Sequence, residues 1–516
     1  MIDRIRSWHD SLRALLTPQV LTMLFLGIAA GLPLLLIFSS LSLWLREAGI
    51  ERSAVTYFSW AALGYSFKFV WAPLLDTLPL PWLHRLLGRR RSWLLVSQLA
   101  IILAIIGMGS VDPAKDSLTL MAFAAVFLGF SAATQDVVID AYRIESAEIR
   151  LQALMSASYI AGYRIGMLLA GAGALYLASY FGSDMGAYDY AAWQQSYYLM
   201  ALLMLIGVIT TLLCREPHAD PLKTPCRKQD SLGLLLAFVL AVSAFIGCFY
   251  LTRGWADQVG PMLMPVLQNG PLTSVLIELC RLVLAALIAV LVGRTLIRLG
   301  LVRQQVLQRS YVEPVVDFFR RHGVSAAVLL LLLVGLYRIS DIVLGVIANV
   351  FYQDMGFTKP EIATVVKTFG LFMTIFGGFV GGLLAMRYGV MRILMLGAIL
   401  SAMTNLLFML LATLGHDLMM LYVVISADNL SAGIASAAFI AFLSSLTNIS
   451  FTAVQYAIFS SLMTLIPKML GGYSGGMVEA MGYPQFFLLT ALLGLPVLVL
   501  IWLSGRYFKL SNNVPE

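Results

Sequence analysis

The most unusual charges in this sequence lie in the stretch QDVVIDAYR, residues 135–143, which closes the apolar run 118–138. Asp136, Asp140 and Arg143 are spaced four and three residues apart, so on a helix their side chains share one face. A charged side chain that faces lipid at the centre of a bilayer costs about 2.5–3.5 kcal/mol, so this face must contact protein or water. Two carboxylates beside a guanidinium could exchange protons, form ion pairs or, as in enzymes with a D-x-x-x-D motif, hold Mg²⁺.

Further charged residues interrupt other apolar segments, and each is a functional candidate because burying it is costly. Lys68 and Asp136 are each roughly 12 Å inside their segments, eight residues before Asp76 and seven before Arg143 respectively. If their helices are neighbours, the two can pair. The pair would either fix helix register or provide a titratable carboxylate that couples proton uptake to a conformational change.

Aromatic residues accompany these charges: Tyr57 and Trp60 precede Lys68 on one helical face, and Tyr159 and Tyr163 form a similar stripe. Aromatic faces beside cations suit sugar rings and carboxylates, although such stripes are also common in ordinary packing. Cations outnumber anions in the spans, which favours an anionic substrate. The substrate-binding candidates are Tyr57, Trp60, Lys68, Asp136, Tyr159, Tyr163, Arg164, Arg338, Asp341, Lys367, Asp428 and Asn429, and the proton-coupling candidates are Asp136 and Lys68.

Asp140 and Arg143 lie closer to the end of their segment than Asp136. Together with a basic turn they predict a cytoplasmic gate that stabilises an outward-open state, or else they are solvated charges at a helix end. The candidate gate residues are Asp76, Arg89, Arg90, Arg91, Asp140 and Arg143.

The composition defines the elements that must position these residues. The chain has 516 residues, of which 60% are hydrophobic and 12% charged, too few polar groups to cover a soluble domain. Apolar runs of about 20 residues recur, each long enough to cross a bilayer core of roughly 30 Å. We therefore predict an all-α polytopic membrane protein.

The net charge of +7 lies in short loops that alternate with loops almost free of arginine. This pattern indicates a membrane orientation with both termini in the cytoplasm, and not nucleic-acid binding. The four cysteines have no paired spacing and the five histidines fall in loops or tails, so we predict neither disulfides nor a metal site.

The predicted order is two six-helix bundles with two additional helices between them, or fourteen spans. A weak repeat supports this order, because EAGIERSAVTYF (47–58) parallels QDMGFTKPEIATVV (353–366). A parallel repeat of six spans is typical of the major facilitator fold. The predicted segments are a cytoplasmic amphipathic segment (1–17), the first bundle (18–214), a basic cytoplasmic linker (215–231), the additional helices (232–300), a second amphipathic segment (301–322), the second bundle (323–505) and a cytoplasmic tail (506–516).

The chain resembles the AmpG family of muropeptide permeases, which belongs to the major facilitator superfamily. The stretches that carry the resemblance are GLPLLL (31–36), FVWAPLLD (69–76), GRRRSWLL (88–95), QDVVIDAYR (135–143), GYRIGMLLAG (162–171), LYRISD (336–341), VVKTFGL (365–371) and DNLSAG (428–433). They lie in both predicted bundles and skip the two additional helices.

The resemblance implies import of GlcNAc-1,6-anhydroMurNAc, with or without a stem peptide, across the bacterial inner membrane from periplasm to cytoplasm. It implies a role in peptidoglycan recycling, an influence on β-lactamase induction, and a proton gradient as driving force without a cofactor. The expected partners are the muropeptide and the lipid bilayer, and a monomer suffices. Two alternatives stay open: a related facilitator that carries acetyl-CoA, which is similar around QDVVIDAYR, and a membrane-embedded Mg²⁺-dependent transferase.

Overall fold

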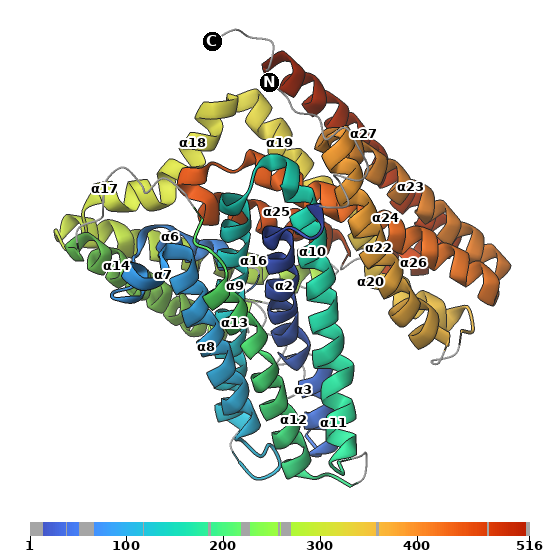
Figure 1. Ribbon diagram of the computed structural model, residues 1–516, viewed down its shortest axis with the longest axis horizontal. Helices are drawn as coiled ribbons and strands as arrows, with labels where there is room; N and C mark the ends of the chain where they lie inside the picture. Colours follow the sequence, from blue (N-terminus) through green and yellow to red (C-terminus); the bar gives the residue numbers. More distant parts are fainter. Residues whose placement is uncertain are drawn as a thin grey trace. The chain divides into compact units, whose positions relative to one another are not determined.

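The structure is a computed structural model that describes residues 14–37, 39–50, 65, 67–116, 118–183, 187–217, 228–255, 258–259, 270–357, 361–471 and 474–511. The described residues form helices joined by short turns, with no β-strand among them (Figure 1). Eleven helices in this part of the chain are long and apolar enough to cross a membrane. The protein is therefore an all-α, multi-pass membrane protein, as predicted.

Three of the fourteen predicted spans are not among these eleven. Residues 53–76 lie largely outside the described residues, 272–297 fall in the 29-residue helix α16 (Gly270–Arg298), and 450–470 overlap a shorter apolar helix, Ile449–Thr464. The count of fourteen and the cytoplasmic placement of the termini therefore stay predictions.

Two compact units make up the chain. The first comprises Met1–Ala72, Pro79–Ala219 and Phe318–Glu516, and the second comprises Pro73–Leu78 and Asp220–Asp317. Apart from Pro73–Leu78, both predicted bundles belong to the first unit, and we call them its first half (up to Ala219) and its second half (from Phe318).

The first half is built around the pair α2–α10, with α8 packed on α9. Glycines allow α2 and α10 to approach closely: a Cβ atom on Gly31 would lie 2.1 Å from the Tyr163 carbonyl oxygen. Small residues at such a contact are the usual solution for helix association in a membrane. The elements are α2 (Pro18–Ile37), α3 (Ser39–Glu47), η2 (Lys68–Val70), α7 (Leu83–Leu87), α8 (Arg89–Gly109), α9 (Leu118–Ser146), α10 (Ile149–Leu168), the π-helical η3 (Leu169–Gly173), α11 (Ala174–Tyr180), α12 (Tyr190–Leu203) and α13 (Leu205–Leu213).

The second half uses the same kind of packing between α22 and α24, where a Cβ on Gly377 would lie 2.3 Å from the Leu430 carbonyl oxygen. Buried aromatic rings, among them Phe351, Phe408 and Phe487, fill its core. The elements are α19 (Val324–Leu336), α20 (Ile339–Asp354), the π-helical η5 (Ile362–Phe369), α22 (Gly370–Tyr388), α23 (Val390–Leu414), α24 (Leu418–Leu446), η6 (Ile449–Phe451), α25 (Thr452–Gly471), α26 (Ser474–Met481) and α27 (Tyr483–Ser511).

Contacts between the two halves involve a few helices. α10 packs against α22 and α24, and both α9 and η2 pack against α25. A Cβ on Gly382 of α22 would lie 3.2 Å from the Ala153 carbonyl oxygen of α10, so the backbones are close here. Several of the candidate side chains, among them Arg143, lie along these contacts.

The second unit contains α14 (Lys228–Leu251), which packs against α16, and the short helices α17 (Gln304–Leu307) and η4 (Gln308–Val312). Arg281 is buried in this largely apolar pair, and its Nε donates a hydrogen bond to Thr252 Oγ1 at 3.2 Å. α6 (Ala72–Thr77) and α18 (Glu313–His322) each begin in one unit and end in the other.

Candidate functional site

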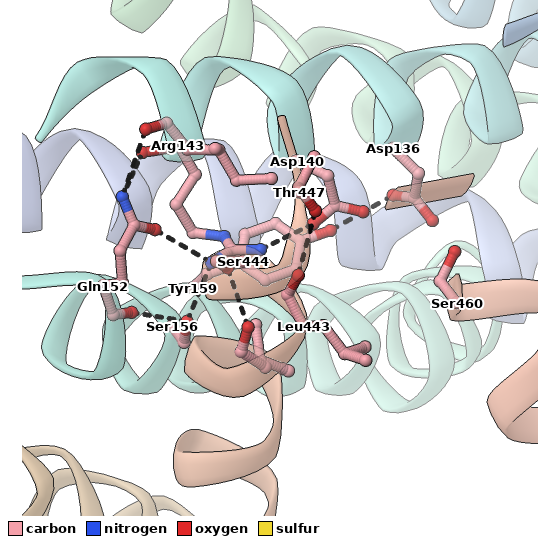
Figure 2. Close-up of polar contacts among 12 residues, drawn as sticks. Asp136, Asp140, Arg143, Gln152, Ser156, Tyr159, Leu443, Ser444, Thr447 and Ser460 are labelled. Carbon is pink, nitrogen blue, oxygen red and sulfur yellow. Dashed lines mark hydrogen bonds and ion pairs between the residues drawn. The ribbon is translucent and has the colours of Figure 1, made fainter. Parts of the chain in front are cut away.

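Arg143, near the C-terminus of α9, is completely buried and joins the two halves of the first unit (Figure 2). Its Nη1 donates hydrogen bonds to Gln152 Oε1 and Ser156 Oγ of α10, both at 3.1 Å, and to Ser444 Oγ of α24 at 2.7 Å. Its guanidinium carbon lies 5.2 Å from the ring centroid of Tyr456 on α25. The buried Arg143 guanidinium thus donates hydrogen bonds to both halves of the first unit, and it also lies over an aromatic ring of the second half.

Gln152 explains how the chain holds Arg143 in place. Its Nε2 donates to the backbone carbonyls of Arg143 and Ala147, both at 2.9 Å, and so satisfies acceptors that the end of α9 leaves without helical partners. Gln455 has a related position after α24, where its Oε1 accepts a hydrogen bond from the Asn448 amide at 2.7 Å. Sequence reasoning missed both glutamines, although each follows a predicted helix–helix turn.

The carboxylates of α9 differ from the prediction in their partners. Lys68 Nζ lies 4.0 Å from Asp140 Oδ2, and Asp140 Oδ1 lies 3.4 Å from Arg143 Nη2. Asp136 instead accepts a hydrogen bond from the Tyr159 hydroxyl at 3.1 Å. The ion pair of Lys68 in the structure is therefore with Asp140, one helical turn from the predicted Asp136, although the charge of Lys68 also acts on Asp136. Depth counted from helix ends is uncertain by about a turn. Asp140 is a shared partner of Lys68 and Arg143.

Arg90, at the start of α8, forms a second link between the halves. Its Nε and Nη2 bond to Glu145 Oε2 and Oε1 at 3.0 and 2.5 Å, and Nη2 also donates to Thr452 Oγ1 of α25 at 2.7 Å. The Thr452 hydroxyl donates to Glu145 in turn, and Arg89 Nη2 lies 3.3 Å from the same carboxylate. The predicted gate did not include Glu145, because a carboxylate at a helix end is usually solvated.

The other predicted gate residues have different surroundings. Arg91 donates to the Thr211 and Leu212 carbonyls at the end of α13, within the first half. Asp76 is buried and belongs to the second unit, so its grouping with the arginines stays a prediction. We call the region around Arg89, Arg90, Arg143 and Glu145 the arginine-rich end.

A second polar cluster lies midway along the helices of the second half. Arg338 Nε is 3.3 Å from Asp341 Oδ2, and its Nη1 donates to Ser436 Oγ at 2.7 Å. Ser401 donates to Asp341, and Thr404 Oγ1 donates to Asp428 Oδ1 at 3.4 Å. Arg338 and Asp341, three residues apart, thus form a local ion pair, and α23 and α24 contribute to the cluster.

The arrangement of two helical halves matches known membrane transporters. The sequence model of the Major Facilitator Superfamily matches residues 19–310 and 330–516. The Rickettsia felis protein AmpG 4 is 30% identical over 482 residues, which cover 93% of this chain and 95% of that protein. The chain belongs to the AmpG family of major facilitator permeases. It is a transporter and not an enzyme, which removes the transferase alternative.

Another relative of this AmpG-family permease is the Escherichia coli K12 anhydromuropeptide permease, 29% identical over 506 residues that cover 97% of this chain and 83% of the relative. The fold is similar to that of the proton:xylose symporter XylE, bound to 6-bromo-6-deoxy-D-glucose, with a TM-score of 0.57, 11% identity and 94% of each chain covered. The structural likeness concerns the fold alone.

The remaining predicted substrate residues of this permease are dispersed over both halves. On α10, Tyr159 and Tyr163 have ring centroids 6.1 Å apart, and Arg164 beside them is exposed. Arg164 is close enough to Arg338 of the second half for their charges to interact. Lys367 in η5 is exposed, and the side-chain oxygen of Asn429 accepts a hydrogen bond from Thr374 at 2.7 Å. Tyr57 and Trp60 lie outside the described residues.

Proposed function

We propose that this permease imports anhydro-muropeptides, GlcNAc-1,6-anhydroMurNAc with or without a stem peptide, from the periplasm to the cytoplasm through the bacterial inner membrane. The observation that carries the proposal is the match over nearly the whole chain to the Escherichia coli anhydromuropeptide permease. Arg164 and Arg338, one from each half, suit the lactyl and peptide carboxylates of such a substrate, and Tyr159 and Tyr163 suit its sugar rings. Peptidoglycan recycling and an influence on β-lactamase induction would follow from this import.

Transport is proposed to proceed by alternating access, driven by the proton gradient. The hydrogen bonds of Arg143 and Arg90 between the halves support this, because a permease of two halves must make and break contacts at each end in turn. If the arginine-rich end is cytoplasmic, as the loop charges predict, the described conformation is closed toward the cytoplasm. Asp136 and Lys68 are the proposed coupling residues in the first half.

Uptake into proteoliposomes tests the proposal. Purified permease should accumulate labelled GlcNAc-anhydroMurNAc-tripeptide when the lumen is alkaline relative to the outside, and should only equilibrate it without a pH difference. Labelled acetyl-CoA should not accumulate under either condition. Accumulation of acetyl-CoA without muropeptide uptake would support the alternative facilitator function and overturn this one.

Replacement of Arg164 by alanine should weaken transport of carboxylated ligands more than of neutral ones. A charge-assisted hydrogen bond contributes about 1.5–3 kcal/mol, so we expect the apparent affinity for the tripeptide substrate to fall by roughly 10- to 100-fold. The measurement is competition against labelled substrate by the muropeptide and by a disaccharide whose lactyl group is amidated. An equal loss for both competitors would show that Arg164 does not contact a carboxylate.

Asp136→Asn should abolish proton-driven accumulation, because the amide keeps the shape of the side chain and its bond to Tyr159 but cannot exchange a proton. Accumulation is measured in proteoliposomes under a fixed pH difference, with Asp189→Asn as control, since Asp189 is an exposed carboxylate at the start of α12. Normal accumulation by Asp136→Asn would remove Asp136 from the coupling mechanism.

A further inference from the structure

Two carboxylates of the second half, Asp341 and Asp428, converge on one face of α23. Ser401 and Thr404 are three residues apart and therefore point the same way from that helix. Ser401 donates to Asp341 of α20, and Thr404 donates to Asp428 of α24. The two carboxylates thus approach the same turn of α23 from two other helices, about 15 Å along α24 from its start.

The charges of this cluster do not balance. Among the described residues, the charged groups that act on Asp428 are Asp341 and Arg338, and the ionisable Tyr352 also lies near it. The single guanidinium is already engaged, with Asp341 at 3.3 Å and with Ser436 at 2.7 Å. Arg164 of the first half acts on Arg338 but is not among the groups that act on Asp428. Asp341, Asp428 and Arg338 therefore leave one negative charge in excess. The hydrogen bond from Thr404 to Asp428 is long, at 3.4 Å, compared with 2.9 Å from the same hydroxyl to the Ser401 carbonyl oxygen.

In the corresponding cluster of the first half, the positive and negative charges are equal in number. There Asp136 and Asp140 are accompanied by two cations, Lys68 and Arg143, both within ion-pair distance of Asp140. An uncompensated charge in the middle of a membrane protein is expensive, whereas a carboxylic acid with a hydrogen-bond partner is not. The excess charge is therefore found in the second half.

We propose that the Asp341–Asp428 pair of the second half binds one proton, held on Asp428, and that this proton site is separate from Asp136. Asp428 is then a neutral carboxylic acid beside the Asp341–Arg338 ion pair. In transport, the Asp428 carboxylate would take a proton from water on the proton-rich side. The acid would return it to water on the other side once the halves have rearranged. The proton site stands without the substrate, whereas its part in transport rests on the proposed function.

The surroundings favour a proton over a metal cation. A sodium or magnesium ion would need several oxygen ligands, and here the Ser401 hydroxyl already directs its hydrogen at Asp341. The guanidinium beside Asp341 would also repel a metal ion. A proton needs only the lone pair of Asp428.

Infrared spectroscopy of the substrate-free permease in lipid tests the site directly. The wild-type protein should show the carbonyl stretch of a protonated carboxylic acid at neutral pH, and the stretch should be lost in Asp428→Asn. Asp417→Asn is the matched control, because Asp417 is the N-cap of the same helix and its side chain accepts a hydrogen bond from Met420 N near the helix surface. An unchanged band in folded Asp428→Asn protein would overturn the proposal.

Thr404→Val provides a second variant should Asp428→Asn fail to fold. It keeps both carboxylates and removes the hydroxyl that bonds to Asp428, so the acid band should remain and move to higher frequency. A band that does not move would place the proton on another residue. Sodium added at constant pH should leave the band unchanged, and its loss with sodium would overturn the proposal in favour of a cation site.

Transport then separates this inference from the proposed function. Asp428→Asn should still exchange labelled for unlabelled muropeptide across the membrane but should lose at least tenfold in proton-driven accumulation. Full accumulation by the variant would show that the proton bound there is not transported. A wild-type protein that shows the acid band but moves no muropeptide would overturn the proposed substrate and leave the proton site intact.

Discussion

Gly162→Val is expected to prevent the permease from folding, because α10 has no room for a side chain where it crosses α2. A Cβ at Gly162 would lie 2.0 Å from the Leu24 carbonyl oxygen, and one at Gly166 would lie 2.2 Å from that of Ile28. From the opposite helix, a Cβ at Gly27 would lie 2.3 Å from the Tyr159 carbonyl oxygen. The contact is therefore backbone against backbone, and the helices can accept a side chain only by separating.

Separation of α2 from α10 should be costly, since overpacking a core costs about 1–3 kcal/mol even where flexible side chains yield. Here the clashing atoms are backbone carbonyls, so we expect a loss near the upper end of that range or the loss of folded protein altogether. The same displacement would move Tyr159 away from Asp136. Any folded Gly162→Val protein should therefore also lose proton-driven uptake.

The measurement is the yield of monodisperse protein in detergent and its midpoint of thermal unfolding. Gly173→Val is the matched control, because Gly173 belongs to the same membrane segment and a Cβ there would have no neighbour within 4 Å. We expect the control to unfold within a few degrees of the wild type. If both variants behave alike, the close approach of α2 and α10 does not limit stability.

This contact also illustrates how much of the fold could be predicted from the sequence. The apolar runs predicted helical spans, the weak repeat predicted two bundles, and the motifs predicted the family, which the comparisons confirm. The stretch GIAAGLP contains several small residues, and two of them, Gly27 and Gly31, provide the close contact with α10. The identity of the partner helix was not predictable, because hydropathy and residue size say nothing about which spans are neighbours.

The candidate site could be predicted only in part, because the sequence does not indicate which spans are neighbours. The spacing of Asp136, Asp140 and Arg143 correctly predicted a shared helical face, since helix geometry alone determines it. The partners on other helices depend on the relative depth of the spans, which a sequence gives only to about a turn. Lys68 therefore lies within ion-pair distance of Asp140, one helical turn from the predicted Asp136. Glu145 was missed because it belongs to the site through its buried ion pair with Arg90, which the sequence spacing does not indicate.

Arg143→Leu is expected to reduce muropeptide uptake by at least 100-fold, because the Arg143 side chain bonds to groups of both halves and to Asp140. The substitution removes the donor to Gln152, Ser156 and Ser444 and leaves the Asp140 carboxylate with Lys68 4.0 Å away. Removing one partner of a buried ion pair costs about 3–5 kcal/mol, and 3 kcal/mol corresponds to somewhat more than 100-fold. Arg143→Lys should restore little of the uptake, since the lysine ammonium lacks the planar guanidinium group whose N–H donors reach both halves.

Arg91→Gln is the control, because Arg91 bonds to α13 within the first half and its loss should leave the contact between the halves intact. Two measurements separate a gate from a general loss of stability: uptake, and the distance between spin labels placed on α9 and α25 at the arginine-rich end. If Arg143 holds this end closed, Arg143→Leu should shift the label distances toward longer values while the protein remains folded. Ser444→Ala, which removes a single acceptor in the second half, should produce the same shift to a smaller extent. Unchanged distances in Arg143→Leu, together with lost uptake, would instead assign Arg143 to the substrate pathway, because the contact between the halves would then not depend on it.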